Sequence, residues 1–225
     1  MLPTPSWSAK SVVALSAVIL ISVILVKSLL AIFPVQSHLE SLLTVPVVFH
    51  GTIFICVALF LRKEKLDWSE AFGFNNRPLG RVYAIGLLSG GLLVPPVLIL
   101  NSLSSSALAR IGISGELLAP GQPLADTHIW FVGVVAIFGS SLAEEVLFRG
   151  IIFPTFCKAG FPQLGLWASS FLYAAANLSL QRLVPLALLG LVCALLFKRF
   201  GNLWASILAH GSFNAVNFGI LILQR

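Results

Sequence analysis

The sequence predicts an all-α fold, a polytopic membrane helix bundle of about seven transmembrane helices (roughly six to eight). Hydrophobic residues make up 58% of the 225 residues and charged residues only 10%, whereas about a quarter of a soluble domain is charged. The mean hydropathy is +0.99. The apolar residues gather in runs of roughly 20, the length that an α-helix needs to cross a bilayer. These observations leave no room for a separate soluble domain.

The apolar runs give the predicted spans in chain order. They are residues 11–33, 44–61, 82–102, 127–157, 163–180, 183–197 and 202–223. The first run exceeds the roughly 7–15 apolar residues of a signal peptide, so we expect it to be a retained span. Gly150 and Pro154 are candidate breaks in the fourth span. Residues 103–126 are a candidate segment that dips into the membrane.

Basic residues are concentrated in alternate connections between these spans. One side carries Lys10, Arg62, Lys63, Lys65, Arg77, Arg81, Lys158, Lys198 and Arg199, and the other carries Arg110, Arg182 and Arg225. The positive-inside rule then places the N-terminus in the cytoplasm and the C-terminus outside. The net charge of +6 is ascribed to this orientation, and nucleic-acid binding is not expected. Loop 67–81 is expected to lie at the cytoplasmic interface.

The segment "SSLAEEVLFRG" places three ionisable groups inside an apolar run. Each charge at mid-bilayer costs roughly 2.5–3.5 kcal/mol, so each needs a partner or a task. Glu145 and Arg149 are four residues apart with the acid first, the spacing and order of a helix salt bridge. Glu144 points about 100° away from Glu145 around the helix. We therefore expect Glu144 to face a cavity, where a buried carboxylate suits general acid–base catalysis.

A second polar group lies on the last span. His210, Asn214 and Asn217 share one helix face. At about 1.5 Å per residue, Glu144 and Asn177 both lie about 21 Å from the cytoplasmic turns, and Asn214 about 18 Å. Helix-to-helix hydrogen bonding alone explains such residues, but their shared depth favours one polar cavity. His50 is alone on its helix, and we interpret it as a packing residue rather than a ligand.

Two motifs in this region resemble the CPBP family, the CAAX-protease and bacteriocin-processing membrane proteins, also called the ABI family. "EEVLFRG", residues 144–150, resembles that family's EExxxR motif, and "NLWASILAHGSFN", residues 202–214, resembles its last motif, with an HxxxN core. The middle motif of the family is FxxxH, but here the matching residues read "YAAAN" and end in Asn177. The resemblance covers residues 130 to 217. We accordingly expect N-terminal spans and loops in 1–126 and a four-helix catalytic core in 127–225.

The resemblance implies an intramembrane endopeptidase. Carried over residue by residue, Glu144 becomes the general base, His210 and Asn214 become the donors to the oxyanion, and Glu145 orients Arg149 or the site. The role of the middle-motif histidine falls on Asn177. An amide cannot relay a proton as an imidazole can, although it can hold a water. The catalytic residues implied are thus Glu144, Glu145, Asn177, His210 and Asn214.

The expected chemistry needs no cofactor. Zinc favours three or four His, Cys or carboxylate ligands, and the site offers few, so no metal is expected. Cys56, Cys157 and Cys193 show no metal-binding spacing and are interpreted as apolar packing residues.

Three functions stay open at this stage. The first is a glutamate-dependent intramembrane protease that acts on a membrane-anchored or prenylated peptide through a cleft open to the cytoplasm. The second is an inactive family member that scaffolds or binds a membrane protein partner, which Asn177 favours. The third is a small transporter or channel subunit, which the lack of visible repeats disfavours. A serine protease is disfavoured because no nucleophile turn accompanies the serines. The expected location is a lipid bilayer, either a bacterial cell membrane or an organellar, thylakoid-like membrane.

Overall fold

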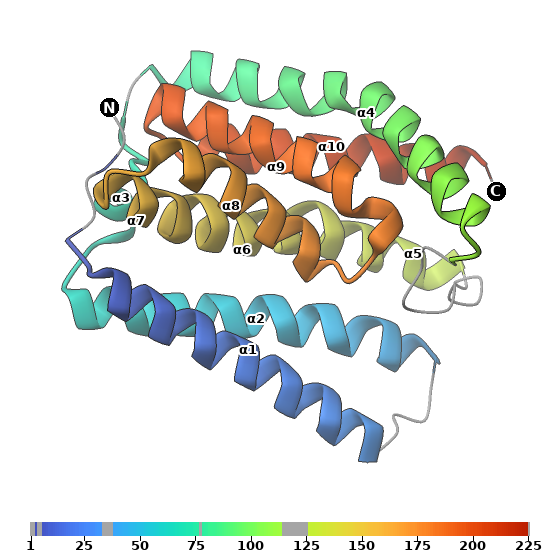
Figure 1. The fold of residues 1–225 in the computed structure, drawn as a ribbon, viewed down its shortest axis with the longest axis horizontal. Helices are drawn as coiled ribbons and strands as arrows, with labels where there is room; N and C mark the ends of the chain where they lie inside the picture. The colour runs from blue at the N-terminus through green and yellow to red at the C-terminus, as the bar shows by residue number, and fades with distance from the viewer. Residues whose placement is uncertain (1–2, 4–5, 33–37, 77, 114–125, 225) are drawn as a thin grey trace.

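The computed structural model describes residues 3, 6–32, 38–76, 78–113 and 126–224, and within these ranges the chain is helical and contains no strand (Figure 1). One stretch, 126–158, is a continuous helix that changes its winding four times. The elements in chain order are α1 (Ala9–Ile32), α2 (His38–Glu64), α3 (Trp68–Phe72), α4 (Leu79–Arg110), α5 (Asp126–Val134), η1 (Val135–Ser140), α6 (Ser141–Glu145), η2 (Val146–Ile152), α7 (Phe153–Lys158), α8 (Pro162–Ala176), α9 (Leu180–Phe200) and α10 (Trp204–Leu223).

The predicted membrane helix bundle is confirmed. Every predicted span coincides with one of these helical stretches. Among the residues that the structure describes, four helices are long and apolar enough to cross a membrane. They are Leu79–Arg110, Ile129–Lys158, Leu180–Phe200 and Trp204–Leu223. The total of seven spans stays a prediction. Within the segment 103–126, residues 114–125 lie outside the described residues, and the first part is the end of α4.

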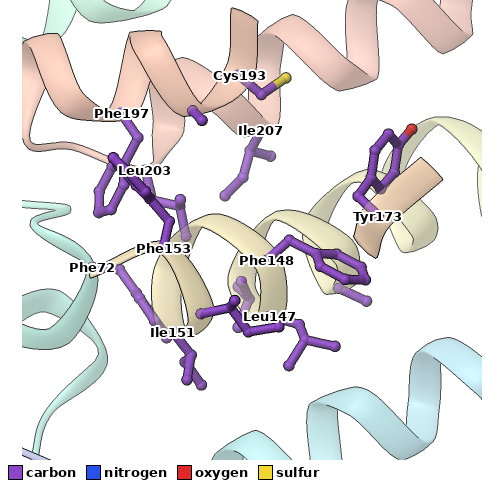
Figure 2. Packing of buried hydrophobic residues seen from close by; sticks show 14 of the residues in the cluster. Phe72, Leu147, Phe148, Ile151, Phe153, Tyr173, Cys193, Phe197, Leu203 and Ile207 are labelled. Carbon is purple, nitrogen blue, oxygen red and sulfur yellow. The ribbon is translucent and has the colours of Figure 1, made fainter. Parts of the chain in front are cut away.

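The fourth predicted span is not broken at Gly150 or Pro154. The helix passes through both residues, because η1 and η2 are π-helical turns rather than breaks. Pro154 is the second residue of α7, just after η2, where the hydrogen-bonding pattern changes and a missing N–H is tolerated. Gly150 serves packing instead, since a Cβ there would lie 2.6 Å from the Phe72 ring. Figure 2 shows Phe72 beside this turn, with Phe153, Phe197 and Leu203 filling the space around it.

Helix α4 packs along α10 through small residues. A Cβ on Gly86 would lie 2.8 Å from the Ala205 carbonyl oxygen, and one on Gly90 would overlap the Ala209 carbonyl. Small residues four apart allow this close approach of helix backbones in membranes. Pro95 and Pro96 lie further along α4, and proline bends a helix by removing N–H donors and crowding the preceding turn. Figure 1 shows α4 changing direction along its length.

One end of the bundle collects the connections that carry most of the basic residues, and we call it the basic end. It holds the start of α1, the end of α2, α3, the end of α7 and the α9–α10 turn (Figure 1). Lys158 donates through Nζ to the Trp7 carbonyl oxygen at 2.9 Å. The Asn202 side chain donates to the Asn76 carbonyl oxygen at 2.9 Å. The sequence therefore groups these turns correctly, while the side of the membrane they face stays a prediction.

Candidate active site

The glutamate pair lies on a short α-helical stretch, α6, between the two π-helical turns η1 and η2. A π turn inserts an extra residue, which widens the helix and rotates all side chains that follow. Glu144, Glu145 and Arg149 are all buried as a result of this placement among the other helices. Such π turns are frequent at functional sites. Sequence periodicity gives no signal for them, and the sequence analysis misses them.

Glu145 forms the predicted ion pair and is fully buried. Its Oε1 accepts a hydrogen bond from Nη1 of Arg149 at 3.0 Å. The same oxygen lies 2.9 Å from Nδ1 of His210. Because an ionised carboxylate only accepts hydrogen bonds, Nδ1 of His210 carries the proton in this contact. Glu145 is thus bonded to groups on either side of it, and it fixes the orientation of the His210 ring.

His210 makes two more contacts through its other nitrogen. Nε2 lies 3.3 Å from the Tyr173 hydroxyl oxygen and 3.8 Å from Oε2 of Glu144. With the proton on Nδ1, Nε2 of the neutral ring is an acceptor, so the Tyr173 hydroxyl donates to it. Tyr173 is not among the site residues predicted from the sequence, although it begins the "YAAAN" segment. Tyr173 is buried, whereas Asn177 is exposed.

Arg149 is completely buried and fits into space left by a glycine. A Cβ on Gly190 of α9 would lie 2.6 Å from Nη2 of Arg149. The guanidinium also stands 4.6 Å from the centre of the Tyr173 ring, within the range of a cation–π interaction. A buried charge is tolerated only when it is paired. The pair with Glu145 and the ring of Tyr173 supply these contacts.

Glu144 faces a cavity, as the sequence predicts, but it is not without a partner. Its Oε1 lies 3.2 Å from Nε2 of His50, which comes from α2. His50 is buried, as its interpretation as a packing residue requires, and this contact gives one of its ring nitrogens a partner. Helix α2 packs against the helix that carries the glutamates, and this brings together two residues that are 94 positions apart. Sequence spacing along one helix cannot reveal such a contact.

The expected amide residues lie near the site but point elsewhere. Asn177 follows the end of α8, and its Nδ2 donates to the Tyr173 carbonyl oxygen of its own helix at 3.1 Å. Asn214 donates through Nδ2 to the Ala136 carbonyl oxygen in η1 at 2.8 Å. Asn217 donates to the Phe213 carbonyl oxygen of its own helix. Within the described ranges, no hydrogen bond joins Asn177 to Glu144.

A cavity of about 740 Å³ connects these groups. Both polar and apolar side chains line its wall. The lining residues are His50, Val97, Leu98, Asn101, Val135, Ala136, Ser140, Glu144, Tyr173, Asn177, Arg182, Pro185, Leu186, His210, Phe213, Asn214, Asn217, Phe218 and Leu221. A volume of this size and an apolar wall with a few polar groups are typical of ligand sites.

The cavity extends away from the basic end. Its lining includes Arg182 at the start of α9 and Leu221 near the end of α10, and none of the basic-end lysines. The part of α4 beyond Pro95 and Pro96 supplies a wall through Val97 and Leu98. We call this the cavity end. The expected cleft toward the cytoplasm stays a prediction, because the structure does not fix which side of the membrane either end faces. Under the predicted orientation, the cavity end faces away from the cytoplasm.

No set of three or more His, Cys, Asp or Glu side chains within the described ranges is arranged to hold a metal ion. Cys193 is buried, and Cys56 and Cys157 are partly buried, all as free thiols. The expectation that no metal takes part in the chemistry stays a prediction.

Comparison with known proteins bears on the same part of the chain. Residues 126–216 match the family model described as "Rce1-like: Type II CAAX prenyl endopeptidase Rce1-like". This match begins before the glutamate pair and ends after His210 and Asn214. Neither the curated proteins nor the solved structures yield a match to the chain.

Proposed function

Because residues 126–216 match the family model of type II CAAX prenyl endopeptidases, we propose that the chain is a CPBP-type membrane protease, an intramembrane endopeptidase in which Glu144 activates a water molecule. The observation that carries this proposal is the position of Glu144. It is a buried carboxylate on the wall of a large cavity, with an imidazole nitrogen near each of its oxygens. A carboxylate held in this way in a site of low polarity is a suitable general base.

In the proposed reaction a single group, Glu144, both accepts and donates the transferred proton. Glu144 takes a proton from a water in the cavity, and the resulting hydroxide attacks the carbonyl carbon of the peptide bond. The tetrahedral intermediate collapses when Glu144 returns that proton to the leaving nitrogen, and the C–N bond breaks. One water is consumed, and a carboxylic acid and an amine are formed.

The negative oxygen of the intermediate needs hydrogen-bond donors, which usually contribute much of the rate acceleration. The family resemblance assigns this task to His210 and Asn214. Nε2 of the neutral His210 is an acceptor in the observed contacts, so His210 donates to the oxyanion only when its ring is doubly protonated. The Tyr173 hydroxyl and the Asn214 amide also line the cavity, and each would serve the oxyanion by redirecting a proton that it now donates to His210 or to the Ala136 carbonyl oxygen.

Site-directed variants of purified protein test this mechanism. Wild type, Glu144→Gln and Glu70→Gln are incubated in detergent with a panel of membrane-anchored and prenylated peptides, and mass spectrometry identifies the products. Glu70 is an exposed acid at the basic end and serves as the matched control. Removal of a general base lowers the rate by about 10²–10⁴-fold, so we expect Glu144→Gln to lose cleavage while Glu70→Gln keeps it. Equal cleavage by wild type and Glu144→Gln contradicts the proposal.

An inactive scaffold is the second candidate, and the amide at Asn177 favours it. The same panel separates the two functions when Asn177→His is added. If wild type cleaves no peptide and Asn177→His cleaves one, the natural protein is a pseudoprotease that binds a membrane partner. If wild type cleaves and Asn177→His adds little, the site is complete without a histidine at this position.

The cavity end also indicates the side from which substrate arrives. With the basic end in the cytoplasm, the cavity receives peptides from the opposite side of the membrane. In a background that lacks the three cysteines, Asn177→Cys and Lys63→Cys place a thiol at each end. We expect an impermeant thiol reagent outside intact cells to label Asn177→Cys and to spare Lys63→Cys. The reverse labelling places the cavity toward the cytoplasm and overturns this part of the proposal.

A further inference from the structure

The histidine contact to Glu144 comes from a helix outside the segment that matches the family. His50 lies in the middle of α2 and is buried, and its Nε2 is 3.2 Å from Oε1 of Glu144. We propose that His50 is the positioning residue for Glu144 and supplies the imidazole that the middle motif lacks at Asn177. This inference rests on the proposed function, because it assigns a role in that same site.

Packing alone does not explain the contact between His50 and Glu144. A histidine in an apolar span costs free energy unless its polar atoms are used. The ring does pack edge-on against Phe49, which an apolar residue would do equally well. Its Nδ1 has no hydrogen-bond partner within the part of the chain that the structure describes. A carboxylate only accepts, so Nε2 carries the proton that it shares with Glu144.

The two oxygens of Glu144 therefore have different surroundings. Oε1 is held by His50 from α2, and Oε2 faces His210 of α10 across a longer distance of 3.8 Å. The first contact fixes the carboxylate, and the wider gap on the second side opens to the cavity that both histidines line. We place the attacking water on the Oε2 side. The other ionisable groups near this carboxylate are Glu145 and Arg149 on its own helix and Tyr173 on α8.

Asn177 does not perform this task in the observed fold. It is exposed at the end of α8, and its amide donates to a carbonyl of its own helix. The family pattern would bring a histidine to Glu144 from α8, whereas this chain brings one from α2. This contact bears on the predicted division of the chain into N-terminal spans (1–126) and a catalytic core (127–225). The catalytic unit in 127–225 is incomplete without the span that carries His50.

Enzyme kinetics test the positioning role. The variants are His50→Ala, His50→Gln, the double variant His50→Ala/Asn177→His, and Ile55→Ala as the control on the exposed face of the same helix. A misplaced catalytic group costs up to about 10²-fold. We expect His50→Ala to lower kcat by roughly that factor, with KM within about twofold. His50→Gln, which keeps an N–H donor of similar reach, recovers part of the loss, and Ile55→Ala has no effect.

Three results overturn the inference. One is an unchanged kcat in His50→Ala. Another is a loss of kcat in His50→Ala that accompanies a fall in melting temperature and is not recovered in His50→Gln. This pattern would indicate a structural role for His50. The third is an equal loss of kcat in Ile55→Ala. Recovery of activity in the double variant, by contrast, supports the claim that His50 replaces the middle-motif histidine.

A second readout works without any substrate. Hydrophobic carbodiimides label carboxyl groups inside membranes, and mass spectrometry measures the labelling rate of Glu144 at one fixed pH. Because Nε2 of His50 lies 3.2 Å from Oε1 of Glu144, His50→Ala should change this rate, whereas Ile55→Ala should leave it as in wild type. A changed rate in His50→Ala when wild type cleaves nothing supports His50 as the partner of Glu144 while the proposed function fails. An unchanged rate overturns the inference even when wild type cleaves.

Discussion

The two ends of the bundle use polar side chains in opposite ways. At the basic end, Asn76 donates to the Gly201 carbonyl oxygen and Asn202 donates to the Phe74 and Asn76 carbonyl oxygens, so the amides tie loops to the backbone. At the cavity end, Glu144 contacts both His50 and His210, and all three side chains line the cavity. The hydrogen bonds at the basic end connect its loops and stabilise the fold. The cavity end keeps its polar groups available to a ligand.

This difference separates stability from activity. Changes at the basic end should lower the free energy of unfolding and leave the chemistry intact. Changes around Glu144 should lower the cleavage rate and leave the free energy of unfolding nearly unchanged. The boundary between the two regions is the buried Arg149, which pairs with Glu145 and lies against Tyr173. We expect changes at this boundary to affect both properties.

The largest effect on stability is expected at this boundary. Gly190→Val drives a side chain into Nη2 of Arg149, which already lies 2.6 Å from the position of a Cβ. Breaking a buried ion pair costs about 3–5 kcal/mol. We expect a large fall in the thermal unfolding temperature in detergent, with loss of cleavage. Gly219→Val is the matched control, since a Cβ at Gly219 meets nothing within 4 Å. An equal fall in both variants would contradict the assigned role of Gly190.

A smaller effect, confined to stability, is expected at the basic end. Asn202→Ala removes two donated bonds and the one that its Oδ1 accepts from the Trp204 N–H at 3.0 Å. Groups left without a partner cost about 1–3 kcal/mol. The melting temperature should fall while kcat at a permissive temperature stays as in wild type. A loss of kcat without a loss of stability would show that this end takes part in catalysis.

The smallest effect is expected at Asn177. Asn177→Ala removes an amide that is exposed and bonds only within its own helix. Substitutions of this kind change free energies by about 0.5 kcal/mol or less, which corresponds to about a twofold change in kcat. A steady-state measurement beside His50→Ala checks the contrast. If Asn177→Ala loses more activity than His50→Ala, Asn177 holds the catalytic water.

The sequence predicts most of what depends on one helix at a time. The Glu145–Arg149 pair follows from the i,i+4 spacing, and the grouping of basic turns follows from alternate connections. The depth estimate also brings Glu144 and Asn214 to a similar level. These features need only helix geometry and the order of the spans.

The remaining features depend on how helices pack against each other. The contact of His50 with Glu144 requires α2 to lie beside α6, which no local pattern encodes. The π turns shift the register around the glutamates without a clear mark in the sequence. The wall that α4 supplies after Pro95 and Pro96 likewise depends on how that helix packs, which its own sequence does not specify. An ionisable residue inside a span is the one signal that could have singled out His50.

One paired measurement tests the central claim. The claim is that Glu144 performs the chemistry, while the hydrogen bonds at the basic end stabilise the fold. Cleavage rate and melting temperature are measured together for wild type, Glu144→Gln and Asn202→Ala, with one peptide that wild type cleaves. We predict that Glu144→Gln keeps the wild-type melting temperature and loses at least about 10²-fold in rate, while Asn202→Ala melts earlier and cleaves normally. Full activity in a folded Glu144→Gln variant would contradict the account.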